Sequence, residues 1–270
     1  MSPPAKPGDS LVYLFFDLPD MEKNHSVPRQ RYPRSSLPRL PLARVVAVVG
    51  CDGSGKSTLT ADLLARLRDK GEVEWLYLGQ SSGNIADWIR GLPLVGVPFG
   101  RYLARKAERA HSKKDAAPDT LTILVIYLLS RWRAHKFRRM LTRCRRGVVV
   151  ITDRYPQAEV PGFYFDGTGL GAVQTKSWLA RKLAARELRL YQWMASHIPA
   201  LVIRLNIDAE TAHARKPDHK LSMLRDKTAV IPTLQFNGAT ILDLDGRHPY
   251  AQVLDTALHA INDAIWIARD

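Results

Sequence analysis

Five short apolar runs, rich in β-branched residues, recur along the chain from Arg44 onward. They are VVAVV, VEWLYLG, GVVVIT, ALVIRLNI and ATILDLD, at residues 45–49, 73–79, 147–152, 200–207 and 239–245. Helical patterns occupy the segments between and after them, at residues 57–70, about 97–113, 120–146, 172–197, 209–215 and 249–268. Apolar runs of this length, alternating with helical segments, are typical of buried parallel strands in βαβ units.

This alternation predicts an α/β fold with a five-stranded parallel sheet and helices on both faces. In such doubly wound folds the ligand crevice lies at the carboxyl ends of the strands. The first 43 residues differ, because frequent prolines interrupt them and RQRYPRSSLPRLP resembles a basic, extended tether. We therefore expect an irregular N-terminal extension at residues 1–43 and one domain at residues 44–270.

Composition narrows the class of protein. The chain has 270 residues, 46% of them hydrophobic, which is enough for a large core without disulfide or metal support. Two cysteines favour a reducing compartment. The longest apolar run, LTILVIYLL, falls short of the roughly 18 residues that span a bilayer. The chain shows no signal-peptide pattern, so we expect a cytoplasmic protein. A net charge of +14 indicates anionic partners, whether nucleotides, nucleic acid or acidic lipid.

The stretch GCDGSGKST, from Gly50 to Thr58, satisfies the phosphate-binding pattern G-x-x-x-x-G-K-[ST]. Its glycines let backbone N–H groups approach a phosphate closely, and the following helix adds positive potential. Lys56 would reach the β- and γ-phosphates of ATP, and the Ser57 hydroxyl would ligate Mg²⁺. A glycine-rich turn without a ligand is the alternative, but the flanking strand and helix favour a P-loop. The predicted nucleotide-binding residues are Gly50, Gly53, Ser54, Gly55, Lys56, Ser57 and Thr58.

A second motif is VVVITDRYP, residues 148–156, in which an apolar strand ends in aspartate. This is the Walker B pattern, and Asp153 would hold Mg²⁺ directly or through water. The alternative role for Asp153 is to cap the following loop. The presence of a P-loop in the same chain favours the metal site.

A P-loop reading x-D-G-x-G-K-S-T, together with Asp-Arg-Tyr after the third strand, resembles the thymidylate kinase family of P-loop nucleotide kinases. The resemblance covers about residues 44–270 and implies a P-loop NTPase fold, ATP as donor, Mg²⁺ and an arginine-bearing lid. By motif position, it implies that Asp52 contacts the sugar hydroxyl of a small phosphoryl acceptor. It also implies that Arg154 grips the acceptor phosphate, a role that suits a planar guanidinium.

The same resemblance places a lid after the fourth strand, at about residues 209–226. The basic side chains there would stabilise charge on the transferring phosphoryl group, and we name Arg215 as a catalytic candidate. An exposed basic helix without such a role is the alternative. The segment 245–254, after the fifth strand, lies where these kinases pack adenine. The other cations of the lid segment are Lys216, Lys220 and Arg225.

The helical segment ending in RWRAHKFRRMLTRCRR, residues 131–146, contains no acid. We rank a solvated helix face first, a contribution of Arg131 to the acceptor pocket second and a nucleic-acid grip third. Nucleic acid is not an expected partner, because the chain shows no recognised binding module. The histidines lack metal-ligand spacing with cysteine. Cys51, inside the P-loop, is interpreted as a small filler residue.

Two segments depart from the thymidylate kinase pattern. Where the family carries Arg-Glu-Pro, this chain has LGQSSGN at residues 78–84. Where the family has the elements that face thymine, this chain has PQAEVPGFYFDGTGL at residues 156–170. Phe163, Tyr164 or Phe165 would stack on a base or pack in the core. We expect ATP-dependent phosphorylation of a nucleoside monophosphate, thymidylate being the family default. The alternatives are another small acceptor, such as a sugar or phosphorylated metabolite, and a non-catalytic nucleotide-binding regulator. A homodimer is left open.

Overall fold

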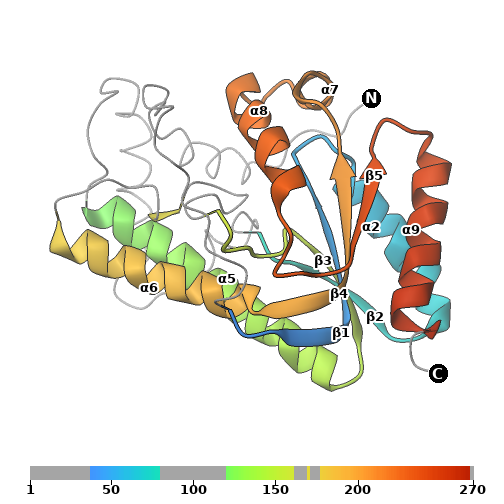
Figure 1. Cartoon of the computed structure of the whole chain (residues 1–270), viewed down its shortest axis with the longest axis horizontal. Helices are drawn as coiled ribbons and strands as arrows, with labels where there is room; N and C mark the ends of the chain where they lie inside the picture. Colours follow the sequence, from blue (N-terminus) through green and yellow to red (C-terminus); the bar gives the residue numbers. More distant parts are fainter. Residues whose placement is uncertain (1–36, 80–119, 161–168, 171–176, 268–270) are drawn as a thin grey trace, which may run out of the picture.

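A single sheet organises the described part of the chain, which comprises residues 37–79, 120–160, 169–170 and 177–267 in a computed structural model (Figure 1). Its strands are β1 (Leu40–Gly50), β2 (Val73–Tyr77), β3 (Val149–Asp153), β4 (His197–Asn206) and β5 (Ile241–Asp245). All neighbours are parallel, in the order β2-β3-β1-β4-β5. The predicted α/β fold with a five-stranded parallel sheet is confirmed, and it is consistent with a P-loop NTPase-like fold.

The alternation of side chains along β1 explains why its residues 45–49 are all apolar. Val46 and Val48 face the helices α2 (Lys56–Leu67) and α9 (Tyr250–Ile265). Val45, Ala47 and Val49 face the opposite layer, which includes α5 (Thr120–Arg145) and α6 (Trp178–Ala195). A strand covered on both faces buries every side chain, so it reads as a continuous hydrophobic run. Figure 1 shows the two helix layers on opposite sides of the sheet.

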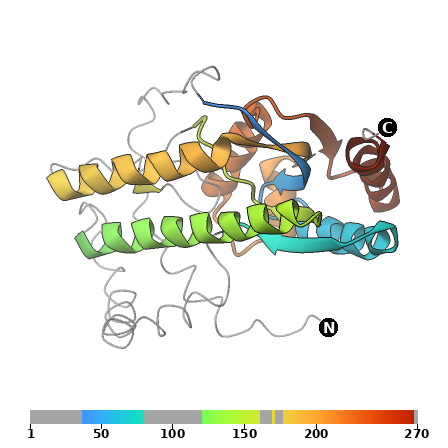
Figure 2. The ribbon, with the colours of Figure 1, turned by 90° about the horizontal axis from the view of Figure 1, so that it is seen from below.

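The helices α5 and α6 pack side by side and run in the same direction, as Figure 2 shows. Each leads at its C-terminal end into a strand, β3 and β4 respectively. The short helices α7 (Ala209–Arg215) and α8 (Leu221–Val230) follow β4 and lie near the carboxyl ends of the strands (Figure 1). This is the end of the sheet at which ligands bind in doubly wound folds.

The observed elements differ from the predicted ones at three places. The strand β1 begins at Leu40, inside the segment expected to be irregular, and Leu40 pairs with His197 at an early start of β4. Pro41 and Pro199 lie in these first rungs, where strands tolerate a missing N–H group. The helix α6 is shorter than predicted and begins after Ser177, whose hydroxyl caps it. The helix α8 was not predicted. The helix expected at about 97–113 lies outside the described residues.

In the part of the chain that the structure covers, no helix combines the length and the apolar character that a membrane crossing requires.

Candidate active site

The loop that follows β1 turns tightly and opens onto the start of α2. Gly53 and Gly55 adopt left-handed φ angles of 84° and 94°, which glycine takes without steric cost. A Cβ atom at Gly53 would lie 2.7 Å from the backbone oxygen of Ala212 in α7. At Gly55 it would meet no atom of the surrounding described residues within 4 Å. The loop therefore backs onto α7 and leaves open space at the N-terminus of α2, where free N–H groups attract anions.

Lys56 is the first residue of α2 and folds back across this loop. It is 6% exposed, and its Nζ donates a hydrogen bond to the carbonyl oxygen of Cys51 at 2.6 Å. Burial lowers the pKa of Lys56, and the charge of Asp153 opposes that shift. Asp153 ends β3 and is in register with Val48 of β1. The structure thus brings the P-loop lysine and the Walker B carboxylate together.

The hydroxyl groups of the P-loop separate into two environments. Ser57 and Thr58 are exposed on the first turn of α2. Ser54 is buried, and its Oγ has no hydrogen-bond partner in the described part of the chain. The Ser54 N–H donates to the carbonyl of Cys51 at 3.2 Å. The Ser54 side chain therefore lies beneath the loop, and Ser57 presents its hydroxyl on the solvent side.

The donor set fits Mg²⁺ bound together with a nucleotide. Ser57 offers a hydroxyl at the start of α2, and Asp153 offers a carboxylate on the neighbouring strand. No group of three or more histidine, cysteine, aspartate or glutamate side chains that would hold a metal ion occurs among the described residues. Mg²⁺ in nucleotide sites needs few protein ligands, because phosphates and water complete its coordination.

Asp52 of the P-loop forms an ion pair with Arg154, the residue that follows β3. Arg154 follows β3 with a left-handed φ of 61°, and its Nη2 lies 2.8 Å from Oδ1 of Asp52. The guanidinium carbon is 5.8 Å from the centre of the Tyr77 ring at the end of β2. The second oxygen of Asp52 accepts a hydrogen bond from Lys227 of α8. Asp52 and Arg154, both named from the sequence, are therefore in contact, and Lys227 contacts Asp52 as well.

Asp52 is ionised in this setting. Burial raises the pKa of its carboxyl group, but the charges of Arg154, Lys227 and Lys56 outweigh burial and hold the pKa well below its usual range. The carboxylate is therefore a fixed negative charge, and it is not a proton acceptor at neutral pH. Burial also raises the pKa of the adjacent Cys51 thiol, which agrees with its interpretation as a filler residue.

The helix α5 supplies two cations next to Arg154 and Tyr77. Arg133 is fully buried, donates to the carbonyl oxygen of Arg154 and lies 3.3 Å from the Tyr191 hydroxyl. Lys136 is buried too; its ammonium group donates to a backbone carbonyl at Gly79 and lies 5.0 Å from the Tyr77 ring centre. Arg131, the residue weighed from the sequence, is exposed. Positions 133 and 136 of this helix turn inward, whereas position 131 lies on a solvated face, the interpretation ranked first from the sequence.

A buried carboxylate links α5 to α6. Glu187 is fully buried and accepts hydrogen bonds from the Ser130 hydroxyl and the Leu170 N–H group, both at 2.6 Å. Burial raises the pKa of Glu187 to about 7, although both hydrogen bonds oppose the shift. Glu187 therefore titrates near neutral pH within the helix pair that holds Arg133.

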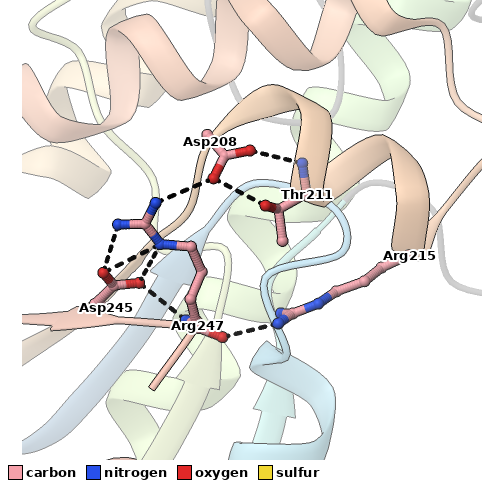
Figure 3. Close-up of polar contacts among 6 residues, drawn as sticks. Asp208, Thr211, Arg215, Asp245 and Arg247 are labelled. Atoms are coloured by element: carbon pink, nitrogen blue, oxygen red, sulfur yellow. Dashed lines mark hydrogen bonds and ion pairs between the residues drawn. The ribbon is translucent and has the colours of Figure 1, made fainter.

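Arg215, the lid candidate, lies at the end of α7 and reaches over the P-loop. It donates to the carbonyl of Gly53 at 3.3 Å. It also donates to the carbonyl of Gly246 at 3.1 Å, the contact drawn from Arg215 in Figure 3. Of the other lid cations, Arg225 is exposed and pairs with Glu210 at 3.2 Å. Lys216 and Lys220 are exposed as well. Within the predicted lid, the structure therefore brings Arg215 to the P-loop.

The loop after β5 is linked to the cap of α7 by a second arginine. Arg247 pairs with Asp245 at 2.7 Å and with Asp208, the cap of α7, at 3.3 Å (Figure 3). A Cβ atom at Gly246 would lie 3.0 Å from the backbone oxygen of Ser54. The segment predicted to pack adenine therefore borders the phosphate-binding loop.

Sequence reasoning missed Lys227, Arg133 and Lys136. For each of them, the spacing from apolar residues of the same helix indicated an inward-facing side chain. Lys227 lies three residues after Leu224 and three before Val230, both buried, so it occupies an inward position of α8. Arg133 and Lys136 likewise alternate with the buried Ala134 and Phe137. The aromatic residues 163–165, and residues 80–84 of the departing segment, lie outside the described residues.

The chain resembles proteins of Escherichia coli over most of its length. No protein-family model matches the chain. It is 57% identical over 222 residues to YghS of strain K12, which covers 82% of this chain and 94% of YghS. It is 45% identical over 218 residues to YghR of strains K12 and CFT073, which covers 81% of this chain and 86% of YghR. Both relatives are named uncharacterized ATP-binding proteins.

Proposed function

The chain belongs to the family of the ATP-binding proteins YghS and YghR, and we propose that it is an ATP-dependent phosphotransferase. It would transfer the γ-phosphoryl group of ATP to a nucleoside monophosphate, with thymidylate as the first candidate. ATP binding has the broadest support, since both relatives carry it in their names. The observation that carries the transfer reaction is the ion pair, 2.8 Å long, between Asp52 of the P-loop and Arg154, which follows the neighbouring strand β3.

The donor half of the site follows from the P-loop. Backbone N–H groups around Gly55 and the N-terminus of α2 would bind the phosphates of ATP, and Lys56 would leave the Cys51 carbonyl to contact them. Ser57 and Asp153 would hold Mg²⁺, which neutralises charge on the phosphates. Arg215 already contacts the P-loop carbonyl of Gly53 and would stabilise charge on the moving group.

The acceptor half is supported by the position of Arg154. The backbone of Arg154 is left-handed, and its guanidinium lies beside Asp52 and Tyr77. Arg133 donates a hydrogen bond to the carbonyl oxygen of Arg154. A planar guanidinium binds two phosphate oxygens at once, which suits a nucleotide phosphate. Phosphoryl transfer depends on alignment and charge stabilisation, so no covalent intermediate with the protein is required.

A panel of acceptors with γ-labelled ATP tests this proposal. The panel holds the nucleoside monophosphates, free nucleosides, sugars and sugar phosphates. We expect label transfer to at least one nucleoside monophosphate. If label is transferred only to a sugar or another metabolite, the protein is a kinase of that compound and the proposed nucleotide acceptor is wrong. ATP binding without transfer to any acceptor would overturn the kinase proposal and favour a nucleotide-binding regulator.

Two variants connect the assay to the site. Lys56→Ala is expected to abolish turnover, and Arg154→Ala is expected to raise KM for the acceptor while leaving ATP affinity nearly unchanged. Arg143→Ala is the matched control, because Arg143 forms a partly exposed 3.3 Å pair with Glu74, a residue of β2. Full activity of Arg154→Ala on every acceptor would show that its assigned role is wrong.

A further inference from the structure

We propose that Lys227 and Arg154 together form a two-cation seat for the phosphate of the acceptor, and that Asp52 holds the two cations in place. This inference rests on the proposed kinase function and refines its acceptor site. It adds a residue from α8 to the site. It also assigns Asp52 a positioning role through its cations, in place of the contact with a sugar hydroxyl that the resemblance implies.

The first observation is that one carboxylate serves two cations. Oδ1 of Asp52 accepts from Nη2 of Arg154 at 2.8 Å, and Oδ2 accepts from Nζ of Lys227. The three side chains are only 20%, 11% and 10% exposed, for Arg154, Lys227 and Asp52 respectively. Both oxygens of Asp52 are therefore already engaged. A sugar hydroxyl would have to compete with charge-assisted hydrogen bonds, which are about twice as strong as neutral ones.

The second observation is the placement of Lys227 on its helix. The helix α8 buries Leu224 and Val230, and Lys227 lies midway between them on the same inward face. An apolar residue is the ordinary choice at such a position, because a buried ammonium group loses its hydration. A lysine here requires an anionic partner, and Asp52, which also pairs with Arg154, supplies it.

The third observation is that α8 is anchored at its C-terminal end. Arg204 of β4 is 6% exposed and donates to the carbonyl of Leu234 at 2.8 Å, just after α8 and its short 3-10 extension. The same guanidinium forms a two-bonded pair with Asp243 of β5, at 2.6 and 2.7 Å. The sheet therefore fixes the end of α8, and Lys227 has a defined position relative to Asp52.

The charges around the seat identify the class of ligand. Arg154 offers a planar fork and Lys227 a compact ammonium group, and a phosphate has oxygens for both. His219 lies near the same carboxylate, and burial lowers the pKa of its imidazole, so at neutral pH it contributes little further positive charge. A phosphate monoester, with close to two negative charges and several acceptor oxygens, complements a guanidinium that lies beside an ammonium group. A neutral sugar does not, so the acceptor carries a phosphate before it is phosphorylated.

Steady-state kinetics of Lys227→Met and Lys227→Arg test the seat on the acceptor that the panel identifies. We expect Lys227→Met to raise KM for the acceptor about tenfold or more, as for loss of a hydrogen bond to a charged group. ATP affinity should change less than about twofold, and Lys227→Arg should recover most of the loss. Lys70→Met is the control, because Lys70 is exposed and its Nζ contacts Asn262, a residue of α9. An unchanged acceptor KM in a folded Lys227→Met protein overturns the seat.

A binding experiment keeps this test separate from the kinase proposal. Inorganic phosphate is titrated calorimetrically into protein saturated with magnesium and a non-hydrolysable ATP analogue. We expect a saturable phosphate site that Lys227→Met and Arg154→Met abolish and Lys70→Met retains. If this site exists but no acceptor is phosphorylated, the seat stands and the proposed function fails. If turnover is observed but phosphate binding does not depend on Lys227, the seat fails and the proposed function stands.

The role of Asp52 has its own readout. Asp52→Asn is compared on the acceptor and on its analogue lacking the sugar hydroxyl group. If Asp52 acts through Arg154 and Lys227, the loss from Asp52→Asn is the same on both compounds. If Asp52 binds the hydroxyl, the loss largely disappears on the analogue, and the positioning role is overturned.

Discussion

Alanine at Gly53 and alanine at Gly55 should damage the protein in different ways. Both glycines have a left-handed backbone, with φ of 84° and 94°, so both substitutions carry a similar backbone cost. For an ordinary residue this cost is about 1–2 kcal/mol. The surroundings of the added methyl group differ, because α7 lies against Gly53 and open space lies beside Gly55. Comparison of the two alanine variants therefore separates an effect on packing from an effect on ligand binding.

The packing cost applies only to Gly53→Ala. Its Cβ atom would lie 2.7 Å from the backbone oxygen of Ala212, well inside van der Waals contact. A backbone atom cannot move aside as the tip of a side chain can, and such overpacking costs about 1–3 kcal/mol. Gly53→Ala should therefore lose about 2–5 kcal/mol of folding free energy in total, and Gly55→Ala about 1–2 kcal/mol.

Urea denaturation without ligand, followed by titration with a fluorescent ATP analogue, measures both effects. We expect Gly55→Ala to bind the analogue at least about tenfold more weakly than the wild type, because its methyl group occupies the space expected for phosphate. This magnitude corresponds to the loss of one hydrogen bond to a charged group. Gly53→Ala should show the larger loss of stability. Equal stability of the two variants would contradict the packing of the P-loop on α7. Normal ATP binding by Gly55→Ala would contradict the assignment of the open space.

Two further predictions concern the helix pair α5 and α6. Burial raises the pKa of Glu187 to about 7, above its value of 4.5 in the unfolded chain. The native state therefore binds the proton more tightly, and wild-type stability should fall by up to about 3 kcal/mol as pH rises from 4.5 to 7. Glu187→Gln should remove this slope in urea denaturation at pH 5 and pH 8, and an unchanged slope would refute the assignment. Arg133→Met should raise KM for the acceptor and leave ATP affinity unchanged, because Arg133 supports the backbone of Arg154. Equal loss of ATP affinity in an isothermal titration would point to general damage instead.

The sheet was predictable because its signals are local. The central strands β1 and β3 carry uninterrupted apolar runs, at residues 45–49 and 149–151, and the helices between the strands exclude antiparallel hairpins. The early start of β1 was not predictable, because prolines at 38 and 41 read as a tether. Pairing of Leu40 with His197 and contact of Arg39 with the Asn237 carbonyl, 3.0 Å away, involve residues more than 150 positions apart. Long-range contacts of this kind override local composition.

The candidate site was predictable only where a motif fixes its position. Lys56, Ser57 and Asp153 lie in patterns tied to strand ends, so the fold brings them together. Lys227 belongs to no motif, and its contact with Asp52 joins residues 175 positions apart. The direction in which an arginine of α5 points also depends on how the helix packs on α6. That packing favours Arg133 over Arg131, and the sequence pattern did not distinguish the two.

Calorimetric titration of the protein with magnesium–ATP tests the central claim most directly. The account predicts saturable binding at one site per chain, weakened about tenfold or more in Lys56→Ala by loss of a charged hydrogen bond to phosphate. Absence of saturable binding by the folded wild-type protein, or equal binding by Lys56→Ala, would contradict the claim that the loop after β1 binds ATP.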